Sequence, residues 1–156
     1  MKKKSLKRIG VILFIGIVIA GSVGAYMWFK PHRDVQSTNA FTTLTAKQLT
    51  DEFTADAAKA NAKYLASDGN SKVLIIEGRV SSINENQNGD KVIILKAEED
   101  KVGVSAGFTK ETNANVSSVK VGDIIKIKGA ISAGNRYDAD LDLYEHAILM
   151  QSDIVK

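Results

Sequence analysis

Residues 73–83 read VLIIEGRVSSI, and this stretch decides the fold class of the chain. Apolar residues or glycine occupy alternate positions, which places them on one face of an extended strand: Leu74, Ile76, Gly78 and Val80. Asn88-Gly89 follows, a dipeptide that supplies positive φ at both centres of a type I′ hairpin turn. Residues 92–95 are apolar again, so they are predicted to form a second strand antiparallel to the first.

Three more apolar runs continue this pattern. Val102–Phe108 contains two glycines, which often mark the bends that small closed barrels require. After a polar link at 109–118, residues 121–131 form the fourth predicted strand, with three isoleucines pointing inward: Ile125, Ile127 and Ile131. The last strand is predicted to begin near Asp140, with Leu141 and Leu143 inward and residues 147–150 completing the core. The chain is therefore predicted to be mainly β, with a five-stranded Greek-key barrel of the OB type.

An amphipathic helix is predicted just before the barrel, over residues 46–65. Thr45 and Gln48 have the spacing of a capping box, in which each side chain bonds the other residue's backbone N–H. Apolar residues then recur every three or four positions, which places them on one helical face: Leu49, Phe53, Ala57, Ala60 and Tyr64. Helix and barrel together are expected to form an OB-fold domain over residues 44–156.

The first 29 residues differ in kind from this domain. Residues 1–8 carry five basic side chains, whereas residues 9–29 carry no charge. About 20 apolar residues span a hydrocarbon core of ~30 Å, so residues 9–29 are predicted to be a transmembrane anchor. Basic residues stay on the cytoplasmic side, so the C-terminal domain is expected outside the membrane, in the periplasm or extracellular space. A cleaved signal peptide, with Val23 and Ala25 at positions −3 and −1, is the alternative.

Two smaller features accompany the anchor. Gly16, Ala20 and Gly24 recur every four residues and could let two helices pair as a homodimer, although small residues are common in any spanning helix. Residues 30–43 contain the single proline, Pro31, and lack apolar periodicity, so they are predicted to be a linker.

Charge and composition exclude several classes of function. Six of the 21 basic residues lie in residues 1–30, so the remaining 126 residues carry 15 basic and 18 acidic side chains. A domain that binds nucleic acid through phosphate contacts is expected to be basic, and this one is mildly acidic. The chain has no cysteine and two histidines, which argues against disulfides, thiolate chemistry, a histidine-based metal centre and a lipid-attached cysteine. No cofactor is expected.

Five segments resemble the tRNA-anti-like OB-fold proteins of bacterial envelopes, many of which are labelled lipoproteins. They are KPHRDV at 30–35, ANAKYL at 60–65, EGRVSSI at 77–83, KVGDIIKIKG at 120–129 and DLDLYEHAI at 140–148. The resemblance implies an OB fold that follows a helix and a membrane anchor or lipoprotein signal. It implies no particular activity, and the missing cysteine departs from the lipoprotein members, which favours a protein anchor over a lipid one.

OB barrels commonly bind oligonucleotides or oligosaccharides on the face of their second and third strands and on nearby loops. The basic and aromatic residues expected near that face are the candidate ligand-binding residues: Arg79, Lys91, Lys96, Phe108, Lys126, Lys128, Arg136 and Tyr137. Base stacking requires aromatic side chains among the cations, and Phe108 and Tyr137 are the ones placed for it. Most of the lysines are expected to be ordinary solvated charges.

Two acidic or titratable features could carry chemistry. Asp138, Asp140 and Asp142 alternate, so on a strand they would share one face and could hold Ca²⁺, although an acidic edge strand is a commoner reason for this pattern. His146 lies beside Glu145, but no nucleophile or second ligand accompanies it. No pattern indicates catalysis, so the chain is predicted not to be an enzyme.

The function predicted from these observations is a membrane-anchored extracytoplasmic module that binds a protein, a peptide or an envelope glycan. Binding of single-stranded nucleic acid is the alternative, which the acidic composition disfavours.

Overall fold

The computed structural model describes residues 15–26 and 33–156, and the chain divides into two compact units, Met1–Arg33 and Asp34–Lys156. Residues 15–26 are helical and exposed, and Gly16, Ala20 and Gly24 belong to this helix. Among the described residues, no helix combines the length and the apolar character needed to cross a membrane. Residues 9–14 and 27–29 of the predicted anchor lie outside the described residues, as do the basic residues 1–8. The anchor and its pairing stripe therefore stay predictions.

The predicted helix before the barrel is two helices. A short strand, β1 (Thr42–Thr45), leads into α2 (Ala46–Ala55), and Thr45 and Gln48 form the expected capping box. Asp56 then adopts extended backbone angles, and its carboxylate accepts a hydrogen bond from the Lys59 N–H at 3.0 Å, which starts α3 (Ala57–Tyr64). The prediction of one continuous helix over 46–65 is wrong because an aspartate at this position competes for backbone donors and acts as a cap.

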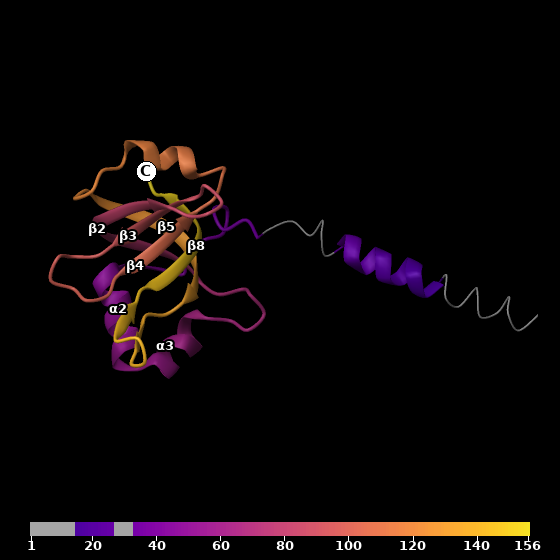
Figure 1. Ribbon diagram of the computed structural model, residues 1–156, viewed down its shortest axis with the longest axis horizontal. Coiled ribbons are helices and arrows are strands. Elements are labelled where there is room, and N and C mark those ends of the chain that lie inside the picture. The colour runs from indigo at the N-terminus through magenta and orange to yellow at the C-terminus, as the bar shows by residue number, and fades with distance from the viewer. Residues whose placement is uncertain (1–14, 27–32) are drawn as a thin grey trace, which may run out of the picture. The chain divides into compact units, whose positions relative to one another are not determined.

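Five strands close into the barrel shown in Figure 1: β2 (Val73–Glu85), β3 (Lys91–Leu95), β4 (Val104–Phe108), β5 (Ile124–Ala133) and β8 (Ala147–Ile154). Their order is β2-β3-β4-β8-β5, and β5 returns to pair with β2. β4 and β8 run parallel, and the other barrel pairs are antiparallel. This is the predicted five-stranded Greek-key barrel. The length of β2 makes closure possible, because β5 pairs with its first half and β3 with its second.

The turn between β2 and β3 differs from the predicted type I′ turn. Gly89 has a φ of +81°, but Asn88 does not have a positive φ. The Gly89 N–H donates to the Asn86 carbonyl at 3.0 Å, and the Asn86 N–H donates to the Asp90 carbonyl at 2.9 Å. These bonds define a three-residue loop in which a left-handed glycine follows a tight turn. The antiparallel pairing of the two strands was predicted correctly.

The segment between β5 and β8 forms a hairpin of its own. β6 (Arg136–Asp138) pairs with β7 (Leu143–Glu145) in a separate two-stranded sheet. Leu141 is 69% exposed and Leu143 is 51% exposed, so the prediction that they point into the core is wrong. The fifth barrel strand is β8 instead, where Ala147 and Leu149 are fully buried. A two-stranded sheet with no layer packed against it leaves its apolar side chains in solvent.

Helical segments cover both ends of the barrel (Figure 1). At one end, Phe53 of α2 packs so tightly on Gly134, just beyond β5, that a Cβ there would lie 2.1 Å from its ring. At the other end lies the 3₁₀ helix η1 (Asn113–Ser118), whose Asn113 side chain accepts from the Lys91 N–H and donates to the Gly89 carbonyl. The largest fully buried side chains line the interior between these ends: Leu49, Tyr64, Leu74, Ile76, Ile93, Leu95, Ile127, Ile131 and Leu149.

Candidate functional site

The outer face of β3 and β4 is where OB barrels commonly bind ligands. Strand register places one row of outward side chains across four strands: Ser82, Ile94, Ser105 and Ile148. A second row runs from Asn84 to Val92 and Gly107. Met150 follows Ile148 two residues along β8 and is 54% exposed. These rows contain no charged residue, so the face offers aliphatic and small polar contacts. The apolar members of the two rows and Met150 are together called the aliphatic row: Val92, Ile94, Ile148 and Met150.

Two of the predicted ligand-binding lysines form ion pairs within the barrel. Lys91 lies 2.6 Å from Glu85 across the β2–β3 turn. Lys126 lies 3.4 Å from Glu77, its cross-strand partner on β2. Cross-strand pairs of opposite charge stabilise the sheet modestly, and the lysine charge is largely compensated there. Neither lysine is therefore available as an uncompensated phosphate contact.

Three other predicted cations also have partners. Arg136 makes a two-point ion pair with Glu145, which is its neighbour on β7, and hydrogen bonding to this carboxylate raises the pKa of Arg136. The Lys128 ammonium donates to the Gln36 carbonyl at 2.8 Å, so it holds the segment that precedes β1. The Arg79 guanidinium donates to the Gly122 carbonyl at 3.0 Å. These contacts give the three residues structural roles.

Phe108 is not a stacking platform. Its side chain is 4% exposed and packs in the barrel core opposite the buried Ser152. Phe108 was predicted to lie near the binding face as a platform for base stacking. Burial alternates regularly along β4, with Val104, Ala106 and Phe108 all buried, so the Phe108 ring is not available for stacking.

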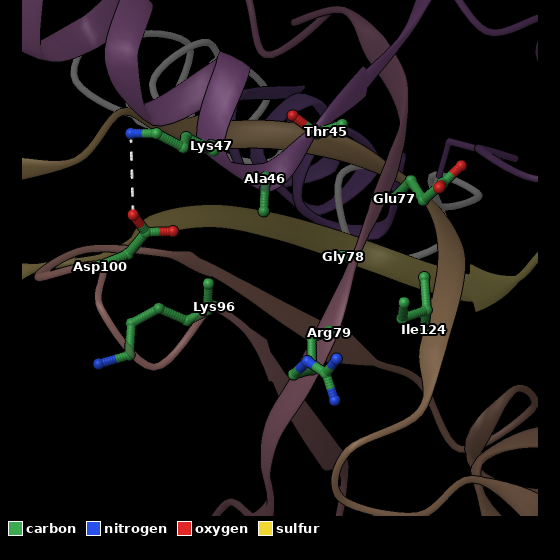
Figure 2. A pocket seen from close by; sticks show the side chains of 10 residues that line it. Thr45, Ala46, Lys47, Glu77, Gly78, Arg79, Lys96, Asp100 and Ile124 are labelled. Atoms are coloured by element: carbon green, nitrogen blue, oxygen red, sulfur yellow. Dashed lines mark ion pairs between the residues drawn. The ribbon is translucent and has the colours of Figure 1, made fainter.

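A shallow recess of about 180 Å³ brings together two of the predicted residues, Arg79 and Lys96 (Figure 2). Gly78 also lines it, and a Cβ there would meet Leu95 at 3.0 Å and Ala46 at 3.2 Å. Its rim carries carboxylates as well as cations, including Asp100, which lies 3.7 Å from Lys47. The recess is therefore mixed in charge and lacks the run of cations that would follow a phosphate backbone.

Tyr137 stands in a different environment, on the β6–β7 hairpin. It pairs across the hairpin with Tyr144, and the ring centres are 4.7 Å apart. The Tyr137 hydroxyl donates to the Asp142 carboxylate, and this bond raises the pKa of Tyr137. The ammonium of Lys101, from the β3–β4 loop, lies 5.4 Å from the Tyr144 ring centre. The hairpin therefore displays an exposed aromatic pair beside carboxylates.

The acidic residues of the hairpin do not form the predicted row. Asp138 lies at the end of β6, whereas Asp140 and Asp142 lie in the turn. The Asp138 carboxylate accepts from the N–H groups of Asp140 and Leu141, so it shapes that turn. Among residues 15–26 and 33–156, no group of three or more His, Cys, Asp or Glu side chains is arranged to hold a metal ion.

His146 links the β3–β4 loop to the hairpin. Its Nδ1 accepts a hydrogen bond from the Gly103 N–H at 3.0 Å. Burial lowers the pKa of His146, and the nearby positive charge of Lys96 lowers it further. A neutral imidazole that serves as an acceptor is a structural tie between the β3–β4 loop and the hairpin.

A model of the tRNA_anti-like family matches residues 1–139 of this chain. The chain belongs to this family. None of the curated proteins compared with it matches. Among solved structures, one from Klebsiella pneumoniae subsp. pneumoniae MGH 78578 is described as a "putative nucleic acid-binding lipoprotein" and superposes with a TM-score of 0.53. The two chains are 20% identical, and the match covers 81% of this chain and 99% of the other, which shows a shared fold.

The surface of this tRNA_anti-like chain includes exposed residues that sequence reasoning missed. Tyr144 was not a candidate. Leu141, Ile148 and Met150 were predicted to complete the core, and this is wrong because all three are exposed. One signal in the sequence points to the hairpin: Tyr137 and Tyr144 flank an aspartate-rich turn of the kind that connects two short strands.

Proposed function

We propose that this chain is a noncatalytic protein-binding module whose docking face is the outer surface of β3, β4 and β8. The observation that carries the proposal is the aliphatic row, an uncharged and partly exposed stripe on the face that OB barrels commonly use. Apolar side chains at the centre of an interface, with charged residues outside it, are typical of protein partners. The absence of cysteine from the sequence and the structural role of His146 support binding over catalysis.

The proposal includes location outside the membrane, with residues 9–29 as a single-pass anchor. The uncharged run of residues 9–29 and the basic residues before it support this arrangement. Intact mass of the membrane-extracted chain tests whether the N-terminal segment is retained. Protease added to intact cells, or to cells with a permeabilised outer layer, should digest the barrel if it lies outside the cytoplasmic membrane.

Site-specific photo-crosslinking tests the docking face. A photoreactive amino acid replaces Ile148 in the aliphatic row, and a control replaces Val121, which is 64% exposed outside that face. We expect protease-sensitive adducts from position 148 in intact cells, and we expect Met150→Ser to reduce them. Adducts from both positions alike, nuclease-sensitive adducts, or no adduct at position 148 would overturn the proposal.

Single-stranded nucleic-acid binding is the second candidate. The description of the Klebsiella pneumoniae structure and the exposed Tyr137–Tyr144 pair favour it, because aromatic rings can stack on bases. The paired cations disfavour it, since phosphate neutralisation dominates such affinity. Anisotropy of a fluorescent oligodeoxythymidylate, measured with the full chain in mild detergent, separates the two. Binding that weakens steeply with added salt would support this second candidate.

A further inference from the structure

The excess negative charge of the barrel unit, residues 34–156, lies in two neighbouring segments. Residues 34–156 carry 18 acidic and 14 basic side chains. Seven of the acidic and three of the basic residues belong to segments 96–103 and 135–146, so the rest of the unit carries 11 of each. The two segments are neighbours, because Gly103 is bonded to His146 and Lys101 lies over Tyr144. These two neighbouring segments are therefore acidic, whereas the rest of the unit has as many basic as acidic residues.

Segment 135–146 also carries the exposed aromatic pair. Tyr137 is 50% exposed, and Tyr144 is 40% exposed. The faces of tyrosine rings attract cations, and Lys101 already makes such a contact with Tyr144. Asp142, which accepts from the Tyr137 hydroxyl, adds a carboxylate at the edge of the pair. Aromatic faces bordered by carboxylates form an environment that favours a cationic side chain over an anionic one.

The aliphatic row begins where the hairpin ends. Ile148, the first outward residue of the row on β8, follows Glu145 of β7 by three residues. A partner segment bound along the row would therefore reach the hairpin at its end. Phosphate groups would meet repulsion there, since segment 135–146 holds four carboxylates and one guanidinium.

We propose that the β6–β7 hairpin selects the partner, by docking a segment of a protein that presents lysine or arginine among aliphatic residues. This inference rests on the proposed protein-binding function and specifies its partner class. A cation of the segment lies against the exposed face of Tyr137, Asp140 and Asp142 attract it, and its aliphatic residues contact the aliphatic row. The favourable charge pairing also speeds the encounter at low ionic strength.

Fluorescence anisotropy with the full chain in mild detergent tests this inference. The probes are a labelled peptide of alternating lysine and leucine and a second peptide in which glutamate replaces lysine. We expect the lysine peptide to bind at least about tenfold more tightly than the glutamate peptide. Tyr137→Ala with Tyr144→Ala, and separately Asp140→Asn with Asp142→Asn, should each weaken lysine-peptide binding by about tenfold.

Two control variants change exposed residues outside the hairpin and the aliphatic row. Glu85→Gln removes an exposed carboxylate at the β2–β3 turn, at the opposite end of β3, and Val121→Ala trims an exposed apolar residue; neither should change binding. Circular dichroism checks that every variant keeps the wild-type fold. Equal affinity for both peptides, or lysine-peptide binding that both hairpin variants leave unchanged, overturns the inference. If Met150→Ser abolishes peptide binding and both hairpin variants leave it unchanged, the proposed function stands while this inference falls. Binding of oligodeoxythymidylate in place of peptide overturns both.

Discussion

The backbone N–H of Gly103 donates to Nδ1 of His146 over 3.0 Å, and this bond joins the β3–β4 loop to the base of the β6–β7 hairpin. The adjacent Ala147 N–H donates to the Gly103 carbonyl at 3.0 Å. A Cβ at position 103 would lie 2.3 Å from the Leu95 carbonyl oxygen, so glycine is required for this close approach. The two acidic segments are therefore held together by one glycine and one imidazole.

Acidification should weaken this connection. The pKa of His146 is lowered from 6.5 in the folded chain, so the unfolded chain binds a proton more readily. The free energy of unfolding should therefore fall as pH drops below about 6.5 and through the lowered folded pKa. Denaturant titrations across this pH range measure the effect, with His32→Gln as the control for the other histidine. If the free energy of unfolding of His146→Leu depends on pH as strongly as that of the wild type, His146 does not cause the dependence.

His146→Leu should also destabilise the chain at neutral pH. The substitution removes the acceptor of a buried N–H, which costs about 1–3 kcal/mol. His146→Asn offers a carbonyl oxygen as a replacement acceptor and should recover part of the loss. Chemical denaturation of the two variants at one pH compares them. Equal stability of His146→Leu and wild type would mean that the bond contributes little.

Gly134→Ala should destabilise the chain more than Gly107→Ala. A Cβ at 134 would overlap the Phe53 ring, whereas a Cβ at 107 would meet the Leu149 carbonyl oxygen at an ordinary 3.7 Å. Overpacking of this kind typically costs about 1–3 kcal/mol. The midpoints of urea denaturation measure the difference. A larger loss for Gly107→Ala would show that the contact between α2 and the end of β5 is looser than described.

Phe108→Ala and Tyr137→Ala should behave in opposite ways. Phe108 is buried in the core, so its removal should cost about 3–5 kcal/mol of stability. Tyr137 is exposed on the hairpin, so Tyr137→Ala should leave the unfolding free energy within about 1 kcal/mol of wild type. Thermal unfolding followed by circular dichroism gives both values. If Phe108→Ala is as stable as the wild type, Phe108 does not pack in the core and could be a surface contact.

Thr45→Ala should loosen the start of α2. The Thr45 hydroxyl accepts from the Gln48 N–H at 3.1 Å, and the Gln48 side chain accepts from the Thr45 N–H at 2.9 Å. Loss of such a cap typically costs about 1 kcal/mol. Thr45→Ser keeps the hydroxyl and should remain near wild type in denaturant titrations. Equal losses in the two variants would point to the methyl group instead of the cap.

Two patterns between near neighbours in the sequence predicted the local structure correctly. The alternation from Leu74 to Val80 predicted β2, and the spacing of Thr45 and Gln48 predicted the capping box, because both depend on local backbone geometry. Leu141 and Leu143 show the limit of this reasoning. Their alternation is typical of a half-buried strand, but burial requires a second layer, and the β6–β7 sheet has no layer packed on it.

The sequence alone determined that an OB-type barrel follows an uncharged N-terminal segment. The period of the strands, the turn residues and the charge of each segment all follow directly from the order of the residues. Only the tertiary structure decided which side chains remain available for a partner. Lys91, Lys126 and Arg136 are compensated by carboxylates on neighbouring strands, and Phe108 enters the core. The Lys126–Glu77 pair and the burial of Phe108 depend on barrel closure, and the two hairpin pairs depend on strand register, which the order of residue types does not by itself specify.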